Sequence, residues 1–278
     1  MDNQTTKPLY IVTGATDAMG SVVTHRLAEA GHAIVMACYD NEKSEEKARE
    51  LTIRTRNNDI ISMHLDLGSF ASVRSFVQQV KALNRPVAVL VNNASYISRK
   101  SEMSPDGYEK LVQVNFLSTA LLSLLIRPLM VENGRIIFST SLSHTPVSIP
   151  YEFPAVSNFM PITAYAQSKM ALSLFSIYLS TVFRTHHVMV NSVDSGLVNL
   201  SKLGMNRFFS RFQFISNHTG NLESGAKTMM RAIGSSDTGF IFKSGNKQIK
   251  ASSLLRNREV FIKLCNDTMR VLNKQLKG

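Results

Sequence analysis

The sequence has little of several features that mark whole classes of protein. It has only two cysteines, Cys38 and Cys265, which lie far apart in 278 residues. This argues against a disulfide framework and suits a reducing compartment. The polar stretch 1–8 lacks the apolar core of a signal peptide, and no apolar run approaches the ~18 residues of a membrane-spanning helix. We therefore expect a cytoplasmic protein with no membrane span.

Metal-ligand spacings and nucleic-acid motifs are missing as well. The seven histidines show none of the spacings that build metal sites. No nucleic-acid-binding motif accompanies the basic residues, and no linker, repeat or low-complexity tract interrupts the chain. We expect one domain over residues 1–278, with no metal and no nucleic-acid partner.

Positive charge is concentrated in the second half of the chain. Residues 1–140 carry 15 Lys and Arg against 14 Asp and Glu, whereas residues 141–278 carry 16 against 6. A solvated basic face is the simplest interpretation, and peripheral contact with an anionic membrane surface or an acidic ligand is the alternative. Whether the protein forms a homo-oligomer is left open.

Short apolar runs alternate with longer helical patterns along the whole chain. The expected strands read as continuous apolar runs, typical of strands buried on both faces: 9–12, 33–37, 60–65, 87–91, 135–138, 188–193 and 239–242. Helices are expected over 19–30, 42–57, 70–82, 106–130, 163–184 and 221–234, with an added amphipathic helix at 256–276. This order predicts an α/β fold, a doubly wound, Rossmann-type parallel sheet of about seven strands with helices on both faces.

A turn rich in small residues joins the first expected strand to the first expected helix. It reads Thr13-Gly14-Ala15-Thr16-Asp17-Ala18-Met19-Gly20. In a strand–turn–helix context, backbone N–H groups and the helix N-terminus can meet a pyrophosphate. Small residues also form ordinary tight turns, but the position in the first βα turn favours nucleotide binding.

Three further polar positions have two interpretations each. Asp66 ends the third expected strand and Asn92-Asn93-Ala94 ends the fourth. Open α/β sheets bind ligands at such strand ends, although Asp and Asn also suit ordinary turns. Asn115 lies inside an otherwise apolar helical pattern, where an unpaired amide would be costly to bury. It either faces solvent or has a specific partner.

Tyr165 and Lys169 lie four residues apart at the start of an expected helix, which places phenol and ammonium on one face. A free tyrosine has a pKa near ~10 and is a poor base at neutral pH, but a nearby cation favours the phenolate. Tyr165 could then exchange a proton with a carbonyl or hydroxyl oxygen while a nicotinamide exchanges the hydride. Ser139, Thr140 and Ser141 follow the fifth strand, either as an ordinary turn or as hydroxyls that bind the reacting oxygen.

The order of these motifs resembles the short-chain dehydrogenase/reductase family over essentially the whole chain. Thr13-Gly14, Asn92-Asn93-Ala94, Asn115, Ser141 and the Tyr165/Lys169 pair follow the family's order. The resemblance implies hydride transfer between a nicotinamide cofactor and an alcohol or carbonyl substrate.

The same resemblance implies a role for each matched residue. Tyr165 would be the acid/base, and Lys169 would bind the nicotinamide ribose and lower the pKa of that tyrosine. Ser141 would orient the substrate oxygen, and Asn115 would hold a water in the proton relay. The cofactor would lie along Gly14, Thr16, Asp17, Met19, Gly20, Tyr39, Asp66, Leu67, Asn93, Ala94, Tyr165, Lys169, Gly196 and Val198.

Several local strings look like those of the retinol dehydrogenase and protochlorophyllide reductase-like branch of the family. Met36-Ala37-Cys38 and Gln167-Ser168-Lys169 are examples. The spacing from Ser141 to Tyr165 is longer than is usual in the family. We therefore expect an insertion at 142–161 that shapes one wall of the site for a substrate that is lipophilic.

The chain departs from the family pattern around the cofactor. Ala18 and Ser95 each stand where the family usually has glycine, and Ser195-Gly196 replaces Pro-Gly. The tip of the second strand, Cys38-Tyr39-Asp40, lacks the arginine that NADP users often carry. NAD(H) and NADP(H) both remain open, with NAD(H) favoured.

Residues 197–220 are interpreted as a lid over the substrate site. Within them Met205, Phe208, Phe209 and Phe212 follow helical spacing and form one apolar stripe. An ordinary core-packing helix explains the stripe equally well.

Two functions other than catalysis stay open for this scaffold. A cofactor-sensing protein would be expected to lose Ser141, Tyr165 or Lys169, yet all three are present. A membrane-surface binding protein would use the basic second half of the chain. Cofactor titration followed by turnover on a carbonyl panel separates these alternatives from an enzyme.

Overall fold

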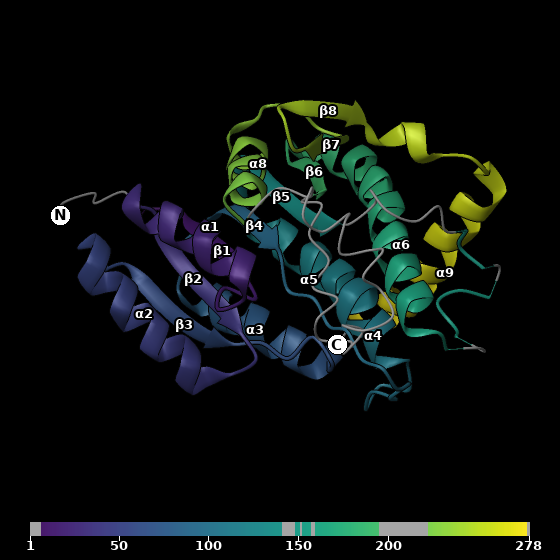
Figure 1. Ribbon diagram of the computed structural model, residues 1–278, viewed down its shortest axis with the longest axis horizontal. Helices are drawn as coiled ribbons and strands as arrows, with labels where there is room; N and C mark the ends of the chain where they lie inside the picture. The colour runs from purple at the N-terminus through teal and green to yellow at the C-terminus, as the bar shows by residue number, and fades with distance from the viewer. Residues whose placement is uncertain (1–6, 141–147, 151, 157–158, 195–221, 277–278) are drawn as a thin grey trace, which may run out of the picture.

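The computed structural model describes residues 7–140, 148–150, 152–156, 159–194 and 222–276. An eight-stranded sheet in the order β3-β2-β1-β4-β5-β6-β7-β8 forms its centre, with helices on both faces (Figure 1). The strands are β1 (Leu9–Thr13), β2 (Ala33–Cys38), β3 (Ile60–His64), β4 (Val87–Asn92), β5 (Met130–Thr140), β6 (Met189–Asp194), β7 (Phe240–Lys243) and β8 (Lys247–Lys250). The first seven are parallel, and β8 pairs antiparallel to β7.

The helices form two layers, one on each face of the sheet. One layer contains α1 (Ala18–Glu29), α2 (Asn41–Thr55) and α8 (Leu222–Gly234). The other contains α3 (Phe70–Ala82), α4 (Lys110–Val112), η1 (Gln113–Leu117), α5 (Ser118–Ile126), α6 (Pro161–Val182) and α9 (Arg258–Leu276). Short 3₁₀ turns η2 (Arg127–Leu129), η3 (Phe183–His186) and η5 (Ala251–Leu254) complete the elements.

Alternate residues of each central strand enter two separate hydrophobic cores. In β1, Leu9 and Ile11 pack with the α3, α5 and α6 layer, whereas Val12 packs with the α1 and α2 layer. All three side chains are at most 1% exposed. Because both faces are covered, neither set of positions can be polar, and this explains why the strands read as unbroken apolar runs.

The predicted doubly wound sheet is confirmed, with two corrections. It has an eighth strand, β8, which the sequence did not predict because Lys247-Gln248-Ile249-Lys250 contains one apolar residue. A turn with Gly245 at φ 71° and Asn246 at φ 60° reverses the chain before it, and such conformations favour Gly and Asn. The guanidinium of Arg231 holds this turn by donating to the carbonyl oxygens of Lys243 and Lys247 at 3.1 and 2.6 Å.

The second correction concerns the helix expected over 106–130. Helical structure begins only at Lys110, and the π-helical turn η1 interrupts it before α5 starts at Ser118. Met130 already belongs to β5, so that strand begins five residues earlier than expected. The stretch 110–129 is long and apolar enough to cross a membrane, but 78% of its most apolar 18-residue segment is buried within the fold. It is therefore the central core helix of this layer.

The C-terminal helix α9 occupies the stretch where the sequence predicts an amphipathic helix. Leu264, Cys265, Thr268 and Leu272 are buried against α5 and α6. Burial raises the pKa of the Cys265 thiol to about 12. The expected lid at 197–220 lies outside the described residues, and so does part of the expected insertion at 142–161.

Candidate active site

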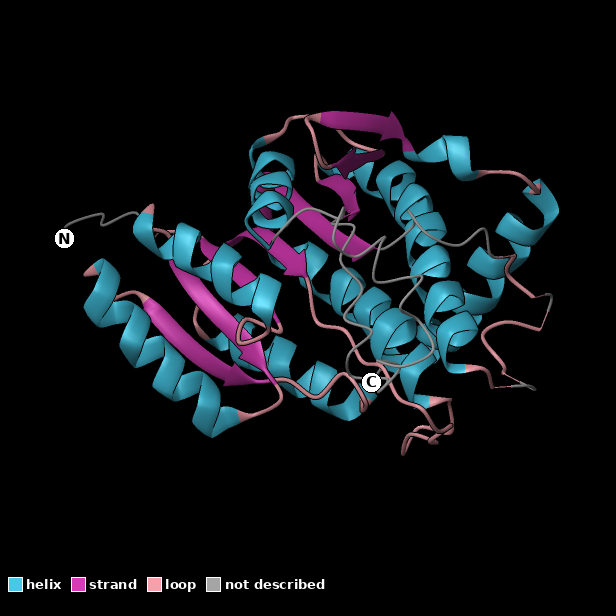
Figure 2. Cartoon of the chain, in the orientation of Figure 1, coloured by secondary structure: helices cyan, strands magenta, loops and turns pink. Residues whose placement is uncertain are grey.

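The arrowheads of the parallel strands point to one edge of the sheet (Figure 2). Thr13, Asp66 and Asn93 lie at or just after the ends of β1, β3 and β4. The strand order reverses between β1 and β4, because β2 lies on one side of β1 and β5 on the far side of β4. Loops leaving the two strands diverge at such a switch point and leave room for a ligand.

The Thr13 hydroxyl joins the ends of β1 and β4. Its Oγ1 accepts hydrogen bonds from the backbone N–H groups of Asn93 and Ala94, both at 3.0 Å, and donates to the Val91 carbonyl at 3.4 Å. The side-chain amide of Asn93 forms a second link between the two strands, because it donates to the carbonyl oxygens of Thr13 and Gly14 at 3.2 and 3.1 Å. These contacts set the position of the glycine-containing turn relative to β4.

The turn itself has no room for side chains at its two glycines. Gly14 has φ +59°, and a Cβ there would lie 2.9 Å from the Ala94 Cα. A Cβ on Gly20 would lie 2.1 Å from the Gly14 carbonyl oxygen. Asp17 is the N-cap of α1 but makes no side-chain cap hydrogen bond. The first-turn N–H groups of α1 are therefore not capped by that carboxylate, and this fits the pyrophosphate of a dinucleotide.

Two other residues of the turn have structural roles. Met19 belongs to the first turn of α1, and its side chain is 8% exposed and packs in the hydrophobic core. Only its backbone is then placed to contact a phosphate. Thr16 hydrogen-bonds the thiol of Cys38 through its backbone and its side chain. Burial raises the pKa of that thiol, so Cys38 is a neutral support beneath the turn.

The residues expected near the adenine and its ribose lie at the ends of β2 and β3. Tyr39 is 72% exposed, and its ring lies 6.0 Å from that of His64. Asp40 is the N-cap of α2 and accepts a hydrogen bond from the Lys43 N–H at 3.1 Å. Asp66 accepts from the Gly68 N–H at 2.7 Å, which is turn chemistry. The adjacent Leu67 is buried.

Asn115 is fully buried and has specific partners, which decides between its two interpretations. Its Oδ1 accepts from the Tyr96 N–H at 2.7 Å, and its Nδ2 donates to the Tyr96 carbonyl at 2.8 Å. The same Nδ2 donates to the Ser168 hydroxyl at 3.3 Å, and that hydroxyl donates to the Tyr165 carbonyl at 2.7 Å. Asn115 thus clamps the loop after β4 to the start of α6. Its role in holding a water stays a prediction.

Tyr165 and Lys169 lie beside each other near the start of α6. The Lys169 Nζ lies 5.8 Å from the centre of the Tyr165 ring and donates to the Ser139 carbonyl oxygen at 3.1 Å. Lys169 is 3% exposed, and burial lowers its pKa from 10.5 to about 8. Burial also raises the pKa of Tyr165, whereas the resemblance implied a lowered value. The reason is that removal from water disfavours phenolate and ammonium alike.

Ser95 is a site residue that sequence reasoning considered only as a departure from glycine. Its side chain hydrogen-bonds Tyr165, which lowers the pKa of that phenol and opposes the effect of burial. Its position is fixed from both sides, since Thr13 binds the N–H of Ala94 and Asn115 binds both backbone groups of Tyr96. The signal in the sequence was a hydroxyl at a position where the resembled family has no side chain.

Several predicted site residues lie outside the described residues: Ser141, Gly196 and Val198. Within the described residues, no group of three or more His, Cys, Asp or Glu side chains could hold a metal ion.

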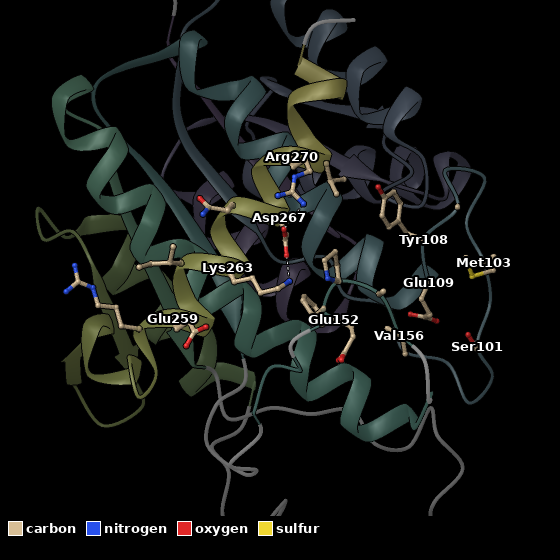
Figure 3. A pocket seen from close by; sticks show the side chains of 18 residues that line it. Ser101, Met103, Tyr108, Glu109, Glu152, Val156, Glu259, Lys263, Asp267 and Arg270 are labelled. Carbon is tan, nitrogen blue, oxygen red and sulfur yellow. Dashed lines mark hydrogen bonds and ion pairs between the residues drawn. The ribbon is translucent and has the colours of Figure 1, made fainter.

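A groove of about 1170 Å³ lies between α9 and the segments 101–109 and 152–156 (Figure 3). Its lining contains none of the predicted catalytic or cofactor-binding residues. Lys263 and Arg270 of α9 both pair with Asp267 on one wall, and Tyr108, Glu109 and Val156 lie on the other (Figure 3). The groove therefore adjoins the expected insertion but is separate from Tyr165 and Lys169.

Replacing Lys169 with methionine is expected to stabilise the fold. The unfolded chain protonates this amine near pH 10.5 and the folded protein only near pH 8, so below pH 8 the buried ammonium opposes folding by about 3 kcal/mol. Loss of the Ser139 hydrogen bond costs about 1 kcal/mol. At pH 7, urea unfolding should show Lys169→Met to be about 2 kcal/mol more stable than the parent.

This gain should shrink as the pH rises from about 8 to about 10.5. In that range the folded protein has released a proton that the unfolded chain still holds, so the stability of the parent rises with pH. Lys81→Met on the exposed face of α3 serves as the control and should change little. A Lys169→Met protein that is less stable than the parent at pH 7 would contradict the assigned burial.

Replacing Ser95 with alanine is expected to raise the pKa of Tyr165, because it removes a hydrogen bond that lowers this pKa. Alcohol oxidation needs the phenolate, so the acid limb of the kcat/KM profile should move to higher pH. Ser95→Gly should move it equally. If only the glycine variant shifts the profile, backbone freedom is the cause and the hydroxyl has no such role.

Comparison with known proteins agrees with this geometry. The family model described as short chain dehydrogenase matches residues 9–209. The chain is similar to human polyprenol dehydrogenase, with 31% identity over 198 residues, 68% of this chain and 60% of that protein. It is also similar to mouse retinol dehydrogenase 12, with 27% identity over 276 residues, 96% of this chain and 87% of that protein.

The alignment with polyprenol dehydrogenase thus spans about 60% of that relative's own length. Among solved structures, the Pseudomonas aeruginosa RhlG/NADP active-site complex has a similar fold, with a TM-score of 0.67 and 23% identity. That similarity covers 85% of this chain and 94% of the other. The matched motifs, the sheet order and the family model together show that the chain belongs to the short-chain dehydrogenase/reductase family, in its retinol dehydrogenase-like branch.

Proposed function

We propose that the protein is an NAD(P)-dependent oxidoreductase that transfers a hydride between a nicotinamide cofactor and an alcohol or carbonyl substrate. One observation carries this proposal: Lys169 is buried beside Tyr165, with its amine held by the Ser139 carbonyl. A buried lysine with a depressed pKa disfavours folding. Such groups are retained mainly at functional sites.

Different residues of this chain would bind the cofactor and transfer the proton. The glycine-containing turn and the N-terminus of α1 would bind the pyrophosphate, and Lys169 would donate to the nicotinamide ribose. The bound cofactor supplies or accepts the hydride. Tyr165 gives a proton to the substrate oxygen in reduction and takes one in oxidation, with Ser95 hydrogen-bonded to its hydroxyl. Asn115 holds the segment of Ser95 and the segment of Tyr165 in fixed relative positions, because it hydrogen-bonds Tyr96 and Ser168.

A lipophilic substrate is supported by the relatives named polyprenol dehydrogenase and retinol dehydrogenase, because polyprenol and retinol are lipophilic alcohols. A catalytically weak cofactor-sensing protein is less well supported, because such a protein has no need of the Lys169 amine beside a phenol.

We propose NAD(H) as the preferred cofactor. Asp40 places a carboxylate at the end of β2, where the 2′-phosphate of NADP would meet a like charge. Tyr39 beside it is exposed and uncharged. The roles of Ser141, Gly196 and Val198, the lid at 197–220 and the cytoplasmic location stay predictions, and the oligomeric state stays open.

Tyr165→Phe is expected to lower kcat by ~10²–10⁴-fold on retinal or a short polyprenal, because the ring keeps its shape but loses the hydroxyl that transfers the proton. Nicotinamide fluorescence should show that cofactor still binds with a similar Kd. Near-full activity of this variant would contradict the mechanism. A parent protein that binds cofactor but turns over no carbonyl in a broad panel would favour the cofactor-sensing alternative.

Asp40→Asn is expected to raise kcat/KM with NADPH several-fold and to leave the value with NADH nearly unchanged, because it removes a like charge from the 2′-phosphate. Asparagine keeps the N-cap of α2, so the fold should not suffer. Glu42→Gln, in the first turn of the same helix, is the matched control for charge alone. Equal gains in both variants would mean that Asp40 does not contact the ribose.

A further inference from the structure

Four exposed basic side chains lie close together in sequence at the C-terminal end of the sheet. Two lie on β8 and two follow η5, up to the start of α9, in the yellow-green to yellow segment of Figure 1. Lys247, Lys250, Arg256 and Arg258 are all exposed, and we call them the basic edge. Between Thr238 and Arg258 the chain contains no Asp or Glu.

The cations of the basic edge differ from those elsewhere on the surface. None of the four forms a salt bridge with a described residue. On α2, by contrast, Lys47 and Arg54 both pair with Glu50, and Arg49 pairs with Glu45. The positive field of α2 is thus neutralised locally, whereas that of the basic edge extends into solvent.

Exposed apolar side chains lie among these charges. Leu255, which directly precedes Arg256, is 38% exposed, and Ile262, one turn after Arg258, is 46% exposed. Ile262 and Arg258 also line the groove, whose opposite side carries Met103 at 66% exposed. Basic residues with apolar ones between them are typical of segments that lie in a bilayer interface.

Two simpler explanations account for only part of these observations. Lysines on β8 would protect an exposed sheet edge from pairing with another chain, but Arg256 and Arg258 lie beyond the strand. A nucleic acid would match the charge but gives no reason for exposed Leu255 and Ile262. An anionic lipid surface matches both the charges and the apolar side chains.

We propose that the basic edge, with Leu255 and Ile262, docks the protein on the surface of an anionic lipid bilayer. Lys247, Lys250, Arg256 and Arg258 would contact lipid phosphates, and the two apolar side chains would enter the interface. The biological reason rests on the proposed function: a lipophilic alcohol or carbonyl dissolves in the membrane, so a protein docked there meets its substrate at high local concentration. Docking itself needs no catalysis.

Vesicle flotation of the full chain, without substrate, tests the proposal directly. The protein is expected to float with vesicles of phosphatidylcholine and phosphatidylserine, and not with phosphatidylcholine alone. Binding should be lost in 1 M salt, where the Debye length falls to about 3 Å. Lys247→Gln, Lys250→Gln, Arg256→Gln and Arg258→Gln together should lower the partition coefficient by about three orders of magnitude.

A matched control removes the same net charge from α2. Lys43→Gln, Lys47→Gln, Arg49→Gln and Arg54→Gln together should leave vesicle binding within a few-fold of the parent. Both quadruple variants should melt near the parent temperature, because surface ion pairs contribute little to stability. Equal losses in the two variants would reduce the effect to net charge and overturn the assigned surface.

Because the chain contains no tryptophan, a single introduced tryptophan reports how deeply its position inserts into the bilayer. Leu255→Trp supplies the only indole, whose emission should shift to shorter wavelength on anionic vesicles and be quenched by brominated lipids. Ile53→Trp, on the exposed face of α2, should show neither change. Unshifted emission from the Leu255→Trp protein on vesicles to which it is bound would contradict insertion at this edge.

Two further results would overturn the docking proposal: a parent protein that does not float with anionic vesicles, or one that binds single-stranded DNA more tightly than lipid. Neither depends on turnover. Conversely, the basic-edge variant should reduce a water-soluble aldehyde at the parental rate. Absence of turnover by every variant would instead contradict the proposed function and leave the vesicle result standing.

Discussion

The arrangement of the site depends on the hydrogen bonds that the Thr13 hydroxyl makes between β1 and β4. Two backbone N–H groups, of Asn93 and Ala94, both donate to this single oxygen in the protein interior. Leaving a buried donor unsatisfied costs about 1–3 kcal/mol, so the two strand ends are held at one separation. That separation brings Ala94 against Gly14 and leaves no space for a Cβ there. From Ala94 the chain passes through Ser95 and Tyr96 to the Asn115 clamp, which reaches the first turn of α6. The nucleotide-binding turn and the acid–base pair are therefore connected by one short run of residues.

The order of strands and helices could be predicted from the sequence because its signals are local and strong. Val87–Val91 is an unbroken apolar run, and few structures other than a buried parallel strand explain it. β8 could not be predicted in this way, since Arg231, twelve residues before Lys243, holds its turn. The partners of Asn115 in the π-helical turn were equally hidden, because Tyr96 and Ser168 are distant from it in sequence. Sequence spacing also says nothing of burial. The positions of Tyr165 and Lys169 were predictable, but the direction of their pKa shifts was not.

Burial of Lys169 lowers the free energy of unfolding but places an amine beside the Tyr165 phenol. An amine that titrates near pH 8 is charged for most of the time at neutral pH, yet it lies among groups that solvate it poorly. Only the Ser139 carbonyl accepts a hydrogen bond from it among the described residues. A nicotinamide ribose would offer it further hydrogen-bond acceptors. Binding of the cofactor is then expected to stabilise the fold, by an amount set by its concentration and its Kd.

The place of α9 in the core has a consequence for the synthesis of the chain. α5 and α6 bury part of their outer surface against Leu264 and Leu272, which follow the end of α5 by well over one hundred residues. While the ribosome is still making the segments between them, that hydrophobic surface lacks its α9 partner. The opposite layer is also completed late, because α8 packs with α1 only after residue 222 has been made. Both faces of the sheet therefore expose hydrophobic surface for most of elongation, and this surface is a binding site for chaperones.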